Sequence, residues 1–299
     1  MKHLLILILL VSLYSSCGTK NAIVAKPKST QETAILIQVS DSEETPAGSK
    51  TPEPSQKDNA KTISLGEDGI ITDDGVSITT EIIYDEAFNH SILDTLLSKY
   101  VSEKGDLDYK SLKQNSKNLR TYIELLKTYQ PAKNWTKNDT LAYWINAYNA
   151  LTIDIILHYY PIQSIKDIKD PWDQRLWKFG DKWINLNEIE HEILRKMDEP
   201  RIHFAIVCAS VSCPKLQNKA YVAAQLNEQL TMATKEFLAD PTKNELTTNQ
   251  ISLSKIFKWF KKDFEQNGSL IDFLNQYTSV KILSEAKRSF KDYNWDLND

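Results

Sequence analysis

The sequence predicts an α+β fold, a helix-rich single domain with a small, mostly antiparallel sheet. Apolar residues repeat at helical spacing in several segments of the C-terminal two thirds. Two short apolar segments flank Gly180-Asp181, which is typical of a β-hairpin. All seven tryptophans lie within residues 80–299, a length sufficient for one substantial core.

The first half of this region is predicted to be mainly helical. Ser91 is a plausible cap for the first helix, Asp139 can cap a long apolar helix, and Pro161 stops that helix. The expected elements are, in order, a helix over 91–101, a turn and short strand over 105–109, and helices over 115–129 and 140–160.

The second half is predicted to mix helices with short strands. Asn187 can cap a helix through Met197, with Glu190 at its third position as in a capping box. The expected elements are a hairpin over 177–184, that helix, a strand beginning at Ile202, and helices over 220–239, 256–264 and 269–277.

The N-terminus is typical of an exported bacterial lipoprotein. A positive start and an apolar run precede small residues, which predicts a signal peptide over residues 1–16. Cys17 follows directly and resembles the lipidated residue of a lipobox, although Tyr14 is unusual at its position. A plain signal peptide with an incidental cysteine is the alternative. We expect a cell-envelope protein, on the periplasmic or outer-membrane side, with a membrane anchor at Cys17.

Residues 17–79 are predicted to be a disordered linker between the anchor and the globular domain, residues 80–299. The linker is rich in Ser, Thr, Pro, Glu and Lys, and such a composition buries too little apolar surface to fold. The net charge of -4 and the lack of a basic patch argue against nucleic acid as a partner. There is no phosphate loop or dinucleotide motif, so no cofactor is expected.

Two asparagines stand out in the long helix. Asn146 and Asn149 are three residues apart in an apolar sequence, so they share a face of a buried helix. Buried amides normally bond to neighbouring backbone, which favours a structural role. The functional alternative is an amide that stabilises an oxyanion at Asn146, with Asn149 contacting the substrate.

The segment from Arg201 to Pro214 contains the main candidate chemistry. If residues 202–207 form a strand, His203 and Cys208 point to opposite faces and lie roughly 16 Å apart, which excludes a dyad. Cys213 precedes Pro214, which can begin a helix, and a thiol at a helix N-terminus has a lowered pKa. Cys213 is therefore the preferred nucleophile, and Cys208 the second candidate.

A disulfide is the competing interpretation of the two cysteines. Four residues separate them, and a turn can bring their Cα atoms within about 7 Å in an oxidising compartment. A zinc site is less favoured because no CxxC spacing is present, so no metal is predicted. His203 or His191 is the candidate base, and Glu190 the group that orients the imidazole.

Four blocks of sequence resemble the domain-of-unknown-function 547 family. They are Tyr143-Trp-Ile-Asn-Ala-Tyr-Asn-Ala150, Ile189-Glu-His-Glu-Ile-Leu-Arg195, residues 200–214 and the ending Tyr293-Asn-Trp-Asp-Leu-Asn298, which departs slightly from the family pattern at 294 and 296. The resemblance covers about Phe88 to the C-terminus and implies no established activity. It places at signature positions Asn146, Asn149, Glu190, His191, Arg201, His203, Cys208, Ser212 and Cys213.

A looser, fold-level analogy links the chain to papain-like and transglutaminase-like hydrolases. In those enzymes a nucleophile near the start of a buried helix precedes a histidine on a strand. Here the helix offers Asn146 in place of a cysteine, so the papain mechanism does not carry over.

These sequence features are compatible with two alternative functions. The first is a cysteine-dependent hydrolase or acyl-transfer enzyme for peptide, amide or ester bonds, with Arg201 and Ser212 binding the substrate. The second is a non-catalytic envelope module that binds a peptide, glycan or protein in an aromatic cleft. An intact Cys208–Cys213 disulfide with a buried His203 would favour the second.

Overall fold

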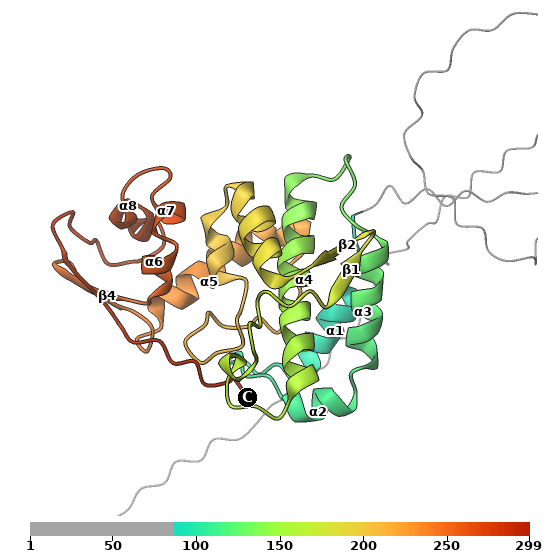
Figure 1. Cartoon of the computed structure of the whole chain (residues 1–299). Coiled ribbons are helices and arrows are strands. Elements are labelled where there is room, and N and C mark those ends of the chain that lie inside the picture. The colour runs from blue at the N-terminus through green and yellow to red at the C-terminus, as the bar shows by residue number, and fades with distance from the viewer. Residues whose placement is uncertain (1–86) are drawn as a thin grey trace, which may run out of the picture. The chain divides into compact units, whose positions relative to one another are not determined.

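The computed structural model describes residues 87–299 (Figure 1). The expected signal peptide over residues 1–16, the lipid site at Cys17 and the linker over 17–79 lie outside the described residues. The observed architecture is α+β, with many helices and two small sheets, as the sequence predicted.

The N-terminal half is a group of helices around one long central helix (Figure 1). α3 packs against α1 and α4, and all four helices contribute to the larger of two hydrophobic clusters. The helices are α1 (Ser91–Tyr100), α2 (Tyr109–Gln114), α3 (Lys117–Thr128) and α4 (Lys137–Tyr159). The turn and short strand expected over 105–109 reduce to a turn and a single β-bridge between Leu107 and Val101, because Asp108 then caps α2 by accepting from Ser111 N–H.

α4 is buried along most of its length, which explains why its sequence is apolar on nearly every face. Its cap is Thr136, which accepts from Asp139 N–H, and the Asp139 carboxylate in turn accepts from Thr136 N–H. Asp139 is therefore the third residue of a capping box and not the cap that the sequence predicted.

The predicted hairpin is confirmed. β1 (Trp177–Phe179) pairs antiparallel with β2 (Lys182–Ile184), and Gly180 makes the turn at φ 59°. The helix expected after Asn187 is irregular: η2 (Glu188–Ile193) is a π-helix and η3 (Leu194–Met197) a 3-10 helix. Asn185 caps this segment by accepting from Glu188 N–H, so Asn187 is not the side-chain cap.

The C-terminal part forms a second hydrophobic cluster beside a three-stranded sheet of order β3-β4-β5. β3 (Glu245–Leu246) pairs antiparallel with β4 (Gln250–Leu253), and β4 pairs parallel with β5 (Lys287–Phe290). The helices of this part are α5 (Leu226–Ala239), α6 (Ile256–Trp259), α7 (Lys261–Phe264) and α8 (Leu270–Asn275). The single helix expected over 256–264 is interrupted at Phe260.

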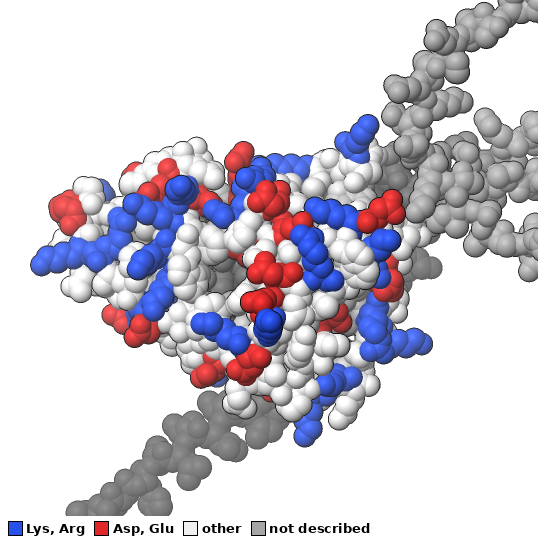
Figure 2. All heavy atoms as spheres, in the orientation of Figure 1, with Lys and Arg blue, Asp and Glu red and all other residues white. Residues whose placement is uncertain are grey.

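The last residues return from this part to the N-terminal helices (Figure 1). Leu297 N–H donates to the Gln163 carbonyl, and Leu107 N–H donates to the Asn298 carbonyl. This return brings residues 293–298 beside the turn at 208–213. No helix within residues 87–299 has the length and hydropathy needed to cross a bilayer. The face in Figure 2 carries basic and acidic side chains side by side.

Candidate functional site

Residues 200–208 do not form the predicted strand. Pro200–Phe204 is a 3-10 helix, η4, with Pro200 in its first turn and the Glu199 carboxylate accepting from Arg201 N–H. The proline and this cap favour a helical turn over an extended strand. The strand geometry that was expected to separate His203 from Cys208 therefore does not apply, and both residues line the same pocket.

Asn146 and Asn149 hold the loops that lead to this pocket. Asn146 donates to the Tyr221 carbonyl at 2.7 Å and accepts from Tyr221 N–H at 3.0 Å. Asn149 donates to the Ala205 carbonyl at 2.9 Å and accepts from Val207 N–H at 3.0 Å. Each amide therefore ties α4 to a passing backbone segment, the structural role weighed from the sequence, and neither lines the pocket.

Two residues that line the pocket, His191 and His203, belong to a network of charged and polar groups centred on Asp263, which together with Arg195 lies outside the lining itself. Arg195 binds the carboxylate of Asp263 through two hydrogen bonds, Nε to Oδ2 at 2.6 Å and Nη2 to Oδ1 at 2.8 Å. His203 Nε2 lies 2.8 Å from Asp263 Oδ2. Arg195 Nη1 also donates to His191 Nδ1 at 3.1 Å. One carboxylate therefore positions Arg195 and His203 directly, and His191 through the arginine.

The network fixes the protonation of its members. Hydrogen bonds from Arg195 and His203 outweigh partial burial and hold the pKa of Asp263 well below its usual range. Burial lowers the pKa of His203 and, with the Arg195 charge, that of His191. Both imidazoles are then neutral at pH 7. His203 carries its proton on Nε2, toward Asp263, and Nδ1 is its basic nitrogen.

Glu190 lies beside this network but outside it. Its side chain is only 7% exposed and accepts a hydrogen bond from the Tyr148 hydroxyl at 3.1 Å. No Lys or Arg of the described chain forms an ion pair with it. Burial raises the pKa of Glu190 to about 7, so a single carboxyl in the pocket changes charge near neutral pH.

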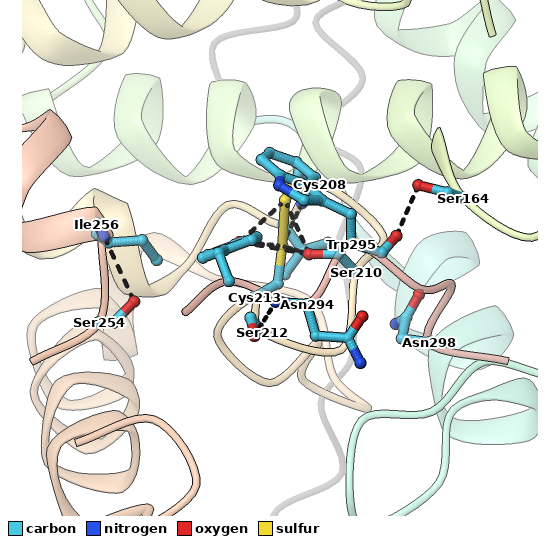
Figure 3. Close-up of a disulfide and its surroundings, with 12 residues drawn as sticks. Ser164, Cys208, Ser210, Ser212, Cys213, Ser254, Ile256, Asn294, Trp295 and Asn298 are labelled. Carbon is cyan, nitrogen blue, oxygen red and sulfur yellow. Dashed lines mark hydrogen bonds between the residues drawn. A yellow bond between two sulfur atoms is a disulfide. The ribbon is translucent and has the colours of Figure 1, made fainter. Parts of the chain in front are cut away.

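The two pocket cysteines form a disulfide (Figure 3). Three donors surround the sulfur of Cys213: Cys208 N–H at 2.9 Å, the Ser210 hydroxyl at 3.3 Å and the Tyr293 hydroxyl at 3.4 Å. Tyr293 comes from the C-terminal segment, which Figure 3 shows next to the disulfide at Asn294 and Trp295. In this state neither sulfur is a nucleophile.

Aromatic side chains form the walls. Trp259, Tyr293 and Trp295 contact one another, with ring centroids 4.6–5.9 Å apart. Trp172 meets Trp295 edge to face at 5.8 Å, and Phe260 stacks on the His203 ring at 3.9 Å. The enclosed volume is about 210 Å³, which suits one chemical group better than a whole extended ligand.

Two of the predicted binding residues lie elsewhere. Arg201 pairs with Glu199 at 2.6 Å and also donates to Asn227 and Thr231, so its guanidinium joins η4 to α5. Ser212 accepts from Asn294 N–H at 2.8 Å and holds the C-terminal segment. The pocket instead brings together Cys208, Cys213, Glu190, His191 and His203. Within the described chain, no group of three or more His, Cys, Asp or Glu side chains is arranged to hold a metal ion.

Sequence reasoning did not single out Asp263, Tyr148, Ser210 or Trp259. Asp263 stands in Lys261-Lys-Asp-Phe264, an ordinary amphipathic sequence with no chemical signature. Tyr148 and Ser210 lie inside the sequence blocks quoted above. Their position next to candidate site residues was therefore the one signal that could have identified them. Tyr293 and Trp295 lie in the C-terminal block, which gave no hint that it reaches the cysteines.

These features define a domain with an aromatic pocket that Glu190, two histidines and the disulfide also line. Residues 132–238 match the family described as "Protein of unknown function, DUF547". This match supports the resemblance seen in the sequence over α4 and the disulfide turn, while Asp263 and the Trp259–Trp295 wall lie beyond it. Comparison with curated proteins and with solved structures found no match.

The Glu190 carboxyl makes stability depend on pH. Its pKa rises from 4.5 in the unfolded chain to about 7 in the folded one, so the folded state holds the proton more tightly. Ionisation of Glu190 therefore lowers the free energy of unfolding as the pH rises from 4.5 to 7, by roughly 3 kcal/mol. We expect Glu190→Gln to be more stable than the native protein at pH 8 but not at pH 4.5, by urea unfolding.

Glu192→Gln is the matched control, because Glu192 is exposed on the same segment. It should follow the native protein within about 0.5 kcal/mol at both pH values. An equal stability difference between Glu190→Gln and native protein at both pH values would show that the Glu190 carboxyl does not titrate in this window.

Proposed function

We propose that this chain is a lipid-anchored protein of the bacterial cell envelope whose folded domain binds a ligand in the aromatic pocket. The observation that carries the proposal is the closed Cys208–Cys213 disulfide beside a His203 that is only 3% exposed. A disulfide is expected of proteins in an oxidising compartment, which agrees with export through the N-terminal segment.

The shape and lining of the pocket support binding of one projecting group. Its walls are flat ring faces and its floor has a few oriented polar atoms, the usual composition of a ligand site. Trp259 remains 46% exposed at the pocket although it is large and apolar. An exposed tryptophan beside a cavity is a typical contact for a sugar ring or a peptide side chain.

Binding can be tested with the full chain and two tryptophan variants. Ligand-observed NMR against amino-acid amides, short peptides and monosaccharides should reveal at least one class that binds. Trp259→Ala should weaken this binding about fivefold to tenfold, because one ring contact is lost. Trp183→Ala removes a ring that is 50% exposed on β2, outside the pocket, and should leave binding unchanged.

Equal affinities in both tryptophan variants and the native protein would place the binding site elsewhere. Absence of binding across all three ligand classes would argue against a binding module.

A cysteine-dependent hydrolase or acyl-transfer enzyme is the second candidate, because of the three donors around Cys213. If an external dithiol reduced the disulfide, these donors would stabilise a Cys213 thiolate and lower its pKa. The thiolate would attack an acyl carbonyl, and the leaving group would take the proton of protonated Glu190 as the thioester forms. Water would then attack the thioester with the basic Nδ1 of His203 or the Glu190 carboxylate accepting its proton, and the acid and the Cys213 thiolate would be released.

The thiol hypothesis is tested by alkylation of variants that each keep one of the two pocket cysteines. In Cys208→Ser the remaining Cys213 should react with iodoacetamide in the folded protein, with a pKa below the usual value of about 8.5. Mass spectrometry of the peptides separates this label from any at Cys17, and Cys213→Ser reports Cys208 as the control. An unreactive Cys213, or one that titrates at or above the usual value, would exclude it as the nucleophile.

A further inference from the structure

We propose that the pocket selects a ligand with an organic ammonium group, which the Glu190 carboxylate pairs with and the surrounding aromatic rings enclose. The inference rests on the proposed binding function and names the chemistry of its ligand. It depends on three features of the pocket: a buried carboxyl without a cationic partner, an arginine that is already engaged, and ring faces that attract cations.

Glu190 is a buried carboxyl that forms no ion pair within the described chain. A buried carboxylate is costly unless a cation or several donors compensate it, and the Tyr148 hydroxyl is the one donor contact to its carboxylate. Arg195 directs its hydrogen bonds to Asp263 and His191, and its charge acts on Glu190 only through space. An ammonium group in the pocket would supply the direct ion pair that Glu190 lacks within the described chain.

The rings already attract cations where the chain provides them. Lys166 Nζ lies 4.8 Å from the centre of the Trp295 ring, and the Arg195 guanidinium lies 5.3 Å from that of Phe260. Both rings line the pocket. The negative faces of aromatic rings stabilise ammonium groups, most of all when water is excluded. An aromatic enclosure with one carboxylate therefore favours a cation over a neutral group of the same shape.

The pocket should bind such a cation more tightly as the pH rises. The pKa of about 7 at Glu190 means that the carboxylate fraction grows between pH 6 and 8. A bound cation favours the ionised form, so binding at pH 7 should release up to about half a proton.

The other groups around Glu190 hold their charge over the upper part of this range. The hydroxyls stay protonated because their pKa values are raised, and Arg195 and Asp263 stay charged as an ion pair. The lowered pKa values keep both imidazoles neutral at pH 7 and above. Of these groups, those that line the pocket with Glu190 are Tyr148 on α4, His191 on η2, His203 on η4 and Tyr293 of the C-terminal segment. Arg195 on η3 and Asp263 on α7 lie outside the lining and act on Glu190 through their charges.

The experiment is calorimetric titration of the oxidised full chain with two matched pairs of probes. Choline is compared with dimethylbutanol, in which carbon replaces the ammonium nitrogen, and butylammonium is compared with butanol. In at least one pair the cation should bind about tenfold more tightly than its neutral counterpart at pH 8. Its affinity should fall at pH 6, and repeats in buffers of different ionisation enthalpy should show proton release at pH 7.

Variants assign the effect to Glu190. Glu190→Gln keeps the size and the Tyr148 contact but removes the charge, so it should lose about tenfold in cation affinity and the proton release. Glu192→Gln removes a nearby exposed charge and should bind as the native protein does.

Each other outcome overturns the proposal in a distinguishable way. If the neutral probes bind as well as the cations, or if Glu190→Gln keeps full cation affinity, the ammonium preference is wrong while the binding pocket stands. If neither member of either pair binds, the ammonium proposal fails and the result also counts against the pocket as a ligand site.

Discussion

The Asp263 carboxylate is the constraint on which the pocket depends. It is the shared acceptor for Arg195 from η3 and His203 from η4, and it belongs to α7 of the C-terminal cluster. These bonds tie together three short helices, the 3-10 helices η3 and η4 and the four-residue helix α7. Removing one partner of such a buried group leaves the others uncompensated, which typically costs about 3–5 kcal/mol. The same carboxylate therefore joins the C-terminal cluster to the segment that precedes the disulfide.

The Asp263 network also determines which groups remain available to contact a ligand. Arg195 bonds to Asp263 and His191 and makes no direct contact with Glu190, which stays buried with the Tyr148 hydroxyl as its donor. The disulfide removes the thiols from the resting pocket. What remains is a carboxyl that titrates near pH 7 beside a wall of aromatic rings, and this combination is the basis of the proposed ligand binding. The donors around Cys213 are the one feature that points toward thiol chemistry.

Local sequence signals predicted the local structure well. The amphipathic helices α1 and α3, the Ser269-capped α8 and the Gly180 hairpin lie where periodicity and turn residues placed them. The cap expected at Ser91 is wrong, because Ser91 is the first residue of α1 and no side chain caps that helix at His90. The strand expected over 202–207 is wrong, because a cap at Glu199 and a proline form a helical turn whose apolar residues are also buried. The candidate site was half predictable: its cysteines, histidines and Glu190 share blocks near one another in sequence. Trp259 lines the pocket, and Asp263, 60 residues from His203, bonds to one of its lining residues, through tertiary packing that no local pattern encodes.

The central claim, that Asp263 fixes a neutral His203 through Nε2, is tested most directly by imidazole nitrogen NMR of the full chain. At pH 7 the account predicts a neutral His203 protonated on Nε2 and a neutral His191 that accepts at Nδ1. In Asp263→Asn the His203 signals should shift and the single tautomer should be lost. A doubly protonated His203, or one protonated on Nδ1 in the native protein, would contradict the account.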